Sequence, residues 1–250
     1  MGIIKSYLIS VYLTIPLIAA GQSIQMIQGH EYVDLGLSVL WASCNIGSNS
    51  PEEYGDYYAW GETYTKSSYN KMTYKFAGET LGATNLPTID AQIKAMLDYT
   101  KYLGEENKQN PNDVKLDIVD DVANAQWGNP WRMPTMNEIS ELVDSCNWEV
   151  GEIKGIKGYW AISKVNGNKV FFPLAGYIYD DVVSDVGKSG KYWASELRKD
   201  MCFEAYQIWI SYEDDSAEMR KKSSVFLSDD GFRENGRSVR AVCERTSINN

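Results

Sequence analysis

The C-terminal part of the chain brings together side chains that proteins use to bind sugars. Trp and Tyr rings stack on the C–H faces of a sugar, and Asn, Asp and Glu hydrogen-bond its hydroxyl groups. The chain holds 8 Trp and 17 Tyr but only 6 Phe, so most of its rings carry a polar tip. We therefore expect a binding surface in the C-terminal loops and strands. Its candidate residues are Tyr177, Tyr179, Asp180, Asp181, Tyr192, Trp209, Tyr212, Phe232, Arg233 and Asn235.

Catalysis has weaker support in the sequence. The single histidine, His30, is not part of a pattern typical of a Ser-His-Asp or Cys-His device. Paired carboxylates could hydrolyse glycans, but neighbouring residues of a strand point to opposite faces, so a catalytic pair requires acids from different strands. We expect most Asp-Asp pairs in solvated turns. These pairs are Asp120/Asp121, Asp180/Asp181, Asp214/Asp215 and Asp229/Asp230.

Metal and cofactor sites are not indicated. One histidine and the absence of a CxxC pair argue against zinc. The loops "YEDDSAE" and "SDDGFREN" supply carboxylates without EF-hand spacing, so structural calcium stays open while no cofactor is expected. The triplets Glu-Pro-Asn and Gln-Pro-Asp, which C-type lectins use to hold a sugar through calcium, are absent from the sequence.

The N-terminus predicts export. Lys5 precedes an apolar run from Tyr7 to Ile18, and small residues follow up to Gly21, so residues 1–21 are typical of a signal peptide. An uncleaved anchor is the alternative. No second long apolar run follows, so we expect the mature chain not to insert into a membrane and to be secreted, periplasmic or on the cell surface.

Charge and cysteine content agree with that location. The net charge of −10 disfavours nucleic acid and anionic membranes as partners. The four cysteines are an even number in a chain predicted to be exported, which suggests two disulfides with three possible pairings. Buried free thiols are the alternative. The cysteines are Cys44, Cys146, Cys202 and Cys243.

Helical signals occupy the first part of the chain. Residues 90–103 have apolar side chains at helical spacing, with Asp90 as the predicted N-cap. Residues 116–128 predict a short helix that ends at Gly128. Thr135 and Glu138 form a capping-box pattern before an apolar stripe that runs to about Cys146. Residues 64–115 are polar and have too few apolar residues for a core of their own, so we predict a long segment that leaves the main domain and returns to it, called here the excursion.

Strand signals fill the remainder. Alternation from Val33 to Val39 predicts a strand, and Asn166-Gly167 between two apolar runs predicts a hairpin with a type I′ turn. Short alternating runs follow in residues 190–197, 205–212, 223–229 and 236–244. Residues 22–250 therefore predict one α+β domain, with short helices packed on a twisted antiparallel sheet of short strands with long loops.

Four motifs carry a resemblance to a known family. "VDLGLSVLWASCNIGSNSPEEYGDYYAWGET", "DDVANAQWGNPWRMPT", "YWAS" and "SVRAVC" resemble the Fibrobacter succinogenes major paralogous domain family of exported Bacteroidetes proteins. The resemblance runs from about Tyr32 to Cys243 and is loose over residues 64–115. "WRMPTMNEISEL" is also similar to a segment of the formylglycine-generating enzymes, whose superfamily has a C-type lectin-like fold.

The resemblance implies further features of this chain. It implies a C-type lectin-like fold with the N- and C-terminal strands close together. It suggests the disulfide pairs Cys44–Cys146 and Cys202–Cys243, although the latter two match the catalytic cysteines of the related enzymes too loosely to carry that activity over. The tryptophans inside the family motifs are expected in the core. They are Trp60, Trp127, Trp131, Trp160 and Trp193.

The function predicted from these observations is recognition. We expect a secreted or surface-exposed, non-catalytic binding module for glycan or protein ligands. An extracellular enzyme that hydrolyses glycans with carboxylates is one alternative. A structural component of a bacterial surface assembly is the other, which an unpaired strand edge or a large apolar patch would favour.

Overall fold

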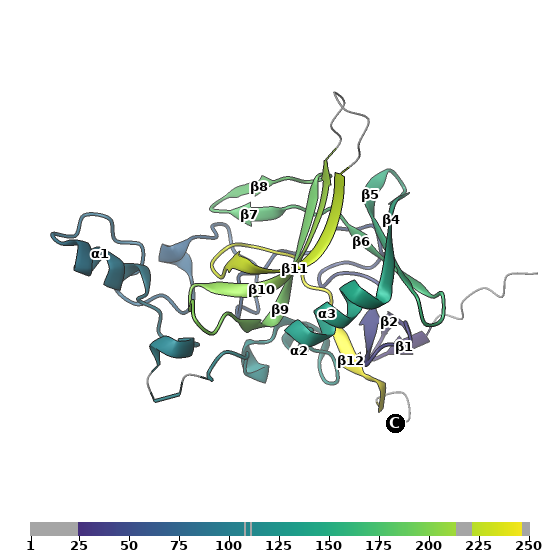
Figure 1. The fold of residues 1–250 in the computed structure, drawn as a ribbon, viewed down its shortest axis with the longest axis horizontal. Coiled ribbons are helices and arrows are strands. Elements are labelled where there is room, and N and C mark those ends of the chain that lie inside the picture. Colours follow the sequence, from purple (N-terminus) through teal and green to yellow (C-terminus); the bar gives the residue numbers. More distant parts are fainter. Residues whose placement is uncertain (1–24, 108, 111, 214–221, 247–250) are drawn as a thin grey trace, which may run out of the picture.

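The computed structural model describes residues 25–107, 109–110, 112–213 and 222–246. The predicted signal peptide and the pair Asp214/Asp215 lie outside these residues. The described chain is α+β, with antiparallel strands and few short helices, as the sequence predicts. It divides its strands among four small sheets rather than the one twisted sheet expected (Figure 1).

The first and last strands of the described residues belong to the same sheet. Its strand order is β1-β2-β3-β12, so the last strand pairs with β3 through Cys243 opposite Leu40. This pairing places the N- and C-terminal strands together, which the resemblance implies. The strands are β1 (Gln25–Ile27), β2 (His30–Val33), β3 (Val39–Ala42) and β12 (Val242–Glu244).

Three further antiparallel sheets follow in the C-terminal half. One has the order β11-β10-β9, another β4-β5-β6, and β7 pairs with β8 alone. The strands are β4 (Cys146–Ile153), β5 (Ile156–Ser163), β6 (Lys169–Pro173), β7 (Tyr177–Tyr179), β8 (Val182–Ser184), β9 (Ser189–Leu197), β10 (Glu204–Glu213) and β11 (Lys222–Phe232).

The helices are short and begin at side-chain caps. Thr88, and not Asp90, caps α1 (Ile89–Met96), which ends well before Leu103. Helix α2 (Val122–Trp127) ends at Gly128 as predicted, in the left-handed conformation that glycine adopts freely. Three 3-10 turns and one longer helix, described next, complete the set. The 3-10 turns are η1 (Lys71–Thr73), η2 (Gly104–Glu106) and η3 (Ile118–Asp120).

The predicted capping box forms at α3 (Met136–Ser145). The Glu138 N–H donates to Thr135 Oγ1 at 3.2 Å, and the Thr135 N–H donates to the Glu138 carboxylate at 2.7 Å. Arg132 then clamps the same carboxylate at 2.8 and 2.6 Å. Ile139 and Leu142 are fully buried beneath the helix, and each buried side chain of this size contributes about 1.5–3 kcal/mol.

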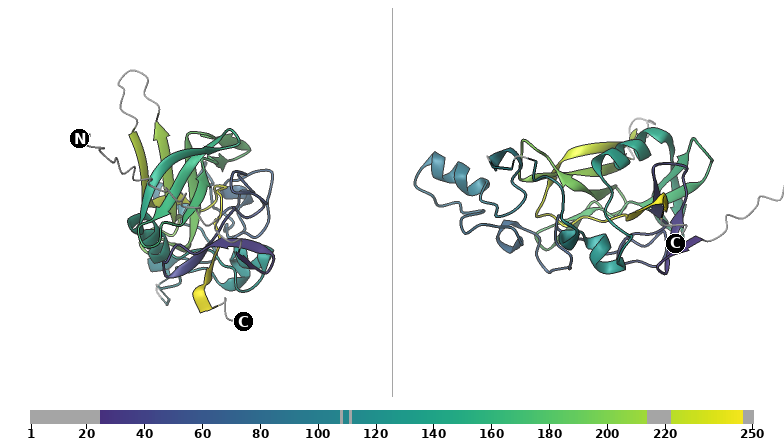
Figure 2. Two further views of the ribbon diagram at one scale, coloured as in Figure 1. Left: turned by 90° about the vertical axis from the view of Figure 1, so that its right-hand side faces the viewer. Right: turned by 90° about the horizontal axis from the view of Figure 1, so that it is seen from below.

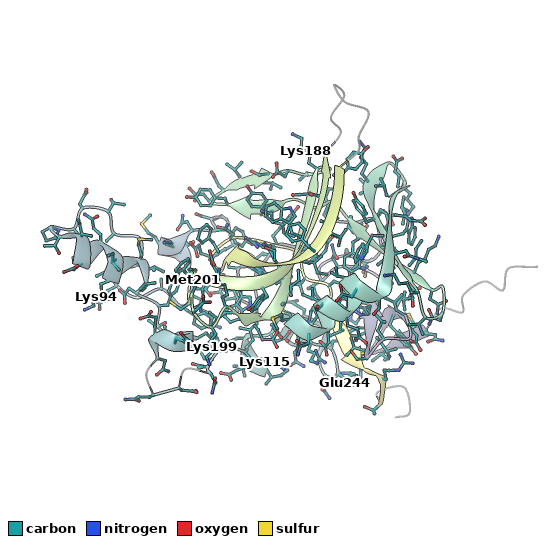
Figure 3. All side chains as sticks on the ribbon, in the orientation of Figure 1. Lys94, Lys115, Lys188, Lys199, Met201 and Glu244 are labelled. Atoms are coloured by element: carbon teal, nitrogen blue, oxygen red, sulfur yellow. The ribbon has the colours of Figure 1, made fainter. Side chains whose placement is uncertain are left out.

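Residues 64–115 extend from one side of the molecule (Figures 1 and 2). Helix α1 and Lys94 lie at the outer end of this excursion, while Lys199 and Met201 mark the β9–β10 turn at its base (Figure 3). The buried rings of its described residues belong to the main core. Its inward rings join a hydrophobic cluster with Trp60 and Trp193, and they are Tyr69, Tyr74, Phe76, Tyr99 and Tyr102.

Two local predictions were wrong. The alternating run from Val33 to Val39 is two strands with a turn between them, although Leu35 and Leu37 are buried as the alternation requires. The β5–β6 hairpin forms, but only Gly167 of its turn has a positive φ, whereas a type I′ turn needs two such residues. The Gly167 N–H donates to the Ser163 carbonyl at 3.0 Å, which closes a longer loop.

Candidate functional site

Strand register places three large side chains in line across the β9–β10–β11 sheet. Trp209 lies opposite Lys191 on one side and opposite Phe226 on the other. The Lys191 ammonium lies 4.3 Å from the centroid of the Trp209 ring, and the Trp209 and Phe226 rings lie 5.6 Å apart. The same ammonium lies 4.0 Å from the ring of Tyr177 on β7. We call these four residues the aromatic row.

The aromatic row faces outward because of the strand period. Tyr192, Ile208 and Ile210 point into the core, so their neighbours Lys191 and Trp209 point away from it. Lys191, Trp209 and Tyr177 are half-buried and the Phe226 side chain is 41% exposed. Regular strands hold the rings in position, which lowers the entropy lost when a flat ligand stacks on them.

A cleft of about 280 Å³ is lined by Tyr179, which lies two residues after Tyr177 on β7. Tyr177 and Tyr179 share one face of β7, and Tyr179 lines the cleft while Tyr177 belongs to the row. Three segments that are far apart in the sequence form the walls. We call it the hairpin cleft, and its residues are Asn70, Lys71, Met72, Gly82, Tyr179, Asp180 and Glu234.

Backbone pairing holds these three segments together. The Tyr69 and Asp180 backbones exchange hydrogen bonds at 2.7 and 2.9 Å. The Ile178 and Gly236 backbones do the same at 2.7 and 2.9 Å. The β7–β8 hairpin is therefore bonded to the excursion through Asp180 and to the segment that follows β11 through Ile178.

The two acids of the hairpin cleft have opposite environments. The Ser68 hydroxyl and the Asn70 amide donate to Asp180 at 2.5 and 2.9 Å, and these bonds lower the pKa of the exposed Asp180 carboxyl. Glu234 is 4% exposed, and burial raises the pKa of its carboxyl. The Tyr99 hydroxyl donates to it at 3.4 Å. Asp180 is thus held as an anion, and Glu234 is shifted toward its neutral form.

Four of the predicted site residues lie away from this surface. Tyr192 is buried beneath the sheet and its hydroxyl donates to the Pro173 carbonyl. Tyr212 packs against the same core cluster, on the face opposite Trp209. Asn235 is 6% exposed, and its Oδ1 has no hydrogen-bond partner among the described residues. Tyr192 and Asn235 are therefore buried, and Tyr212 is partly buried on the other face of the sheet.

Arg233, the fourth, joins the excursion to the body. Its guanidinium is fully buried and donates to the Tyr74 hydroxyl at 2.8 Å. It also donates to the backbone carbonyls of Tyr102, Cys202 and Lys101 at 3.0, 2.8 and 3.0 Å. Rings of the shared core surround the cation, so Arg233 is a structural residue and the prediction that it contacts ligand was wrong.

The remaining two candidates are exposed but separate. Phe232 is 46% exposed and stacks on Phe203 with centroids 6.2 Å apart. Asp181 is exposed in the β7–β8 turn. Neither lines the hairpin cleft. Sequence reasoning missed Lys191, Phe226, Lys71 and Glu234; the alternation of residues 190–197 and 223–229 was the available signal for the first two.

Three of the five tryptophans expected in the core are there. Trp60, Trp131 and Trp193 are fully buried. Trp127 is half-buried and stacks on the His30 ring at 3.9 Å. Trp160 is half-buried beneath Lys169, whose ammonium lies 4.3 Å from the ring centroid. Trp127 thus packs at the edge of the first core cluster, whereas Trp160 belongs to neither core cluster of the described residues.

Asp120 and Asp121 have structural roles, whereas the sequence predicted that most Asp-Asp pairs lie in solvated turns. The buried Asp120 accepts from Lys75 and Lys101 at 2.6 Å each, and from the Tyr102 hydroxyl at 2.7 Å. Asp121 caps α2 and also accepts from the Met133 N–H at 2.8 Å. Within the described part of the chain, no three His, Cys, Asp or Glu side chains gather as a metal site.

The four cysteines are buried free thiols in this structure. The suggested bridges Cys44–Cys146 and Cys202–Cys243 are therefore not present in it. Cys44 Sγ contacts the Ser48 carbonyl at 3.4 Å, and Cys146 packs with the second core cluster beside α3. Burial raises the pKa of both Cys146 and Cys243 to about 11, which disfavours the reactive thiolate.

Comparisons of the chain with protein-family models, with curated proteins and with solved structures found no match. Among the described residues, no helix has both the length and the apolar character needed to cross a membrane.

Proposed function

We propose that this protein is a secreted or surface-exposed, non-catalytic module that binds glycans through the aromatic row. The observation that carries the proposal is the outward alignment of Phe226, Trp209, Lys191 and Tyr177 in one row. Half-exposed rings on rigid strands suit stacking against sugar C–H faces, and the ammonium can donate to hydroxyl groups. The C-type lectin-like fold and the family resemblance belong to the same proposal.

A glycan array with purified protein tests the proposal. Trp209→Ala is expected to weaken binding of the best glycan at least tenfold, because it removes the central ring of the row. A tenfold loss corresponds to about 1.4 kcal/mol of binding free energy.

Trp160→Ala is the matched control. Trp160 is likewise half-buried under a lysine ammonium 4.3 Å from its ring, but it lies on β5 in another sheet. It should leave glycan binding within about twofold of the wild type. Two outcomes would contradict glycan recognition through the row. One is an equal loss of glycan binding in both variants. The other is capture of a surface protein whose binding is changed neither by added glycan nor by Trp209→Ala.

Glycan hydrolysis is the second candidate function, because Asp180 and Glu234 line one cleft from different segments. Their opposite pKa shifts are of the kind that separates a general acid from an ionised partner. A reducing-end assay on bound oligosaccharides distinguishes the two functions. Release of reducing ends that Glu234→Gln abolishes would replace the non-catalytic proposal by hydrolysis.

A further inference from the structure

The hairpin cleft has the size of a site for one small ring. Its volume of about 280 Å³ lies below the roughly 300–1,000 Å³ typical of pockets for drug-sized molecules. Tyr179, which is 60% exposed, supplies a ring at its wall, and Met72 supplies an apolar side chain. A pyranose could place one face on the Tyr179 ring while its hydroxyl groups meet the polar wall.

The polar wall is preorganised. Asn70 caps η1, because its side chain accepts from the N–H groups of Met72 and Thr73 at 2.9 and 3.1 Å. Its amide nitrogen donates to Asp180 at the same time. Asp180 has a φ of 57°, a left-handed conformation that its backbone bonds to Tyr69 maintain. Its carboxylate therefore has a defined orientation before any ligand arrives.

Charge in the cleft favours an uncharged ligand. Lys71 brings a positive charge and Asp180 a negative charge to the same small volume, and Glu234 adds a second carboxyl, whose pKa burial raises. A cationic ligand would meet Lys71, and an anionic ligand would meet Asp180. Hydroxyl groups can accept from an ammonium and donate to a carboxylate, so a neutral polyol satisfies both groups.

We propose that the hairpin cleft is a distinct subsite that holds one uncharged sugar unit at the end of a chain lying on the aromatic row. Tyr177 and Tyr179 connect the two surfaces, since they share a face of β7 and belong to the row and to the cleft respectively. This inference rests on the proposed glycan recognition for the identity of the longer chain. The cleft itself can be tested with single sugars.

The experiment uses the methyl glycosides of glucose, galactose, mannose and N-acetylglucosamine, and linear tetrasaccharides of the same sugars. Titrations of the full chain are followed by NMR chemical shifts and by calorimetry. At least one methyl glycoside should bind, and Tyr179→Ala should weaken it at least tenfold. Trp209→Ala should change that affinity by less than twofold and still weaken the tetrasaccharide at least tenfold.

Three variants make the result specific. Tyr179→Phe keeps the ring and should retain binding of the methyl glycoside, while Lys71→Met should weaken it. Tyr64→Ala removes a tyrosine that is 54% exposed outside the cleft and should have no effect. Because Tyr179 is more than half exposed, its truncation leaves the core intact, and an unchanged near-ultraviolet circular dichroism spectrum verifies this.

Failure of the inference and failure of the proposed function give different results. If no methyl glycoside binds, or if Tyr179→Ala leaves its affinity unchanged, the subsite is refuted. If Trp209→Ala still weakens binding of the tetrasaccharide in that case, the proposed function stands. If Tyr179→Ala weakens binding of a methyl glycoside while Trp209→Ala leaves the affinity for the tetrasaccharide unchanged, the subsite stands and recognition through the row is refuted.

Discussion

Replacement of Arg233 by methionine should release the excursion from the body of the protein. The guanidinium makes four hydrogen bonds at 2.8–3.0 Å, three of them to backbone carbonyls, and all lie in the interior. Methionine fills part of the volume but leaves these acceptors without a donor. An unsatisfied buried acceptor costs about 1–3 kcal/mol, and removal of one partner from a buried charged group costs about 3–5 kcal/mol.

We therefore expect Arg233→Met to lower the free energy of unfolding by about 3–5 kcal/mol. For a domain of this size, each kcal/mol lowers Tm by roughly 2–4 °C, so Tm should fall by roughly 6–20 °C. Denaturation in guanidinium chloride followed by tryptophan fluorescence measures the first quantity. Hydrogen exchange measures the locality of the effect, which should be greatest in residues 70–104.

Arg245→Met is the matched control. The Arg245 side chain is 41% exposed and forms an ion pair at 2.6 Å with Asp34, whose side chain is 30% exposed. Exposed pairs of this kind contribute about 0–1 kcal/mol, so this variant should be close to the wild type. If Arg233→Met costs no more than Arg245→Met, or if Arg233→Lys fully restores stability, the anchoring role of the four guanidinium hydrogen bonds is refuted.

Three further predictions concern stability and thiol chemistry. Because the pKa of Glu234 is raised in the folded protein, its protonated form is favoured there, and the wild type should be less stable than Glu234→Gln near pH 7. The free energies of unfolding of the two proteins should converge as the pH falls through the folded pKa toward about 4.3. A constant difference from pH 4 to 8 would contradict this. Thr135→Ala should cost about 1 kcal/mol in the same assay through loss of the capping box, and an unchanged midpoint would argue against it. The four buried thiols should resist Ellman's reagent in the native protein and all react in denaturant without reductant, while fewer than four reactive thiols would indicate disulfides.

Local features of this protein followed directly from short sequence patterns. The capping box at Thr135, the end of α2 at Gly128 and the strands of the C-terminal half each depend on a few neighbouring residues. Where a neighbour competes, such prediction fails: Thr88 precedes Asp90 and takes the cap of α1. The separation of strands into four sheets was not predictable, because it depends on pairings between distant residues such as Cys243 and Leu40.

The candidate site shows the same division. The sequence by itself determined which aromatic and acidic residues are available. It also determined the two-residue period of the strand, by which Trp209 points outward when Ile208 and Ile210 face the core. Only the tertiary structure decided that Arg233 lies inside and that Tyr179, Lys71 and Glu234 meet in one cleft. The physical reason is that side-chain exposure along a strand is a local property, whereas a cleft wall and a buried cation exist only when segments far apart in the chain pack against each other.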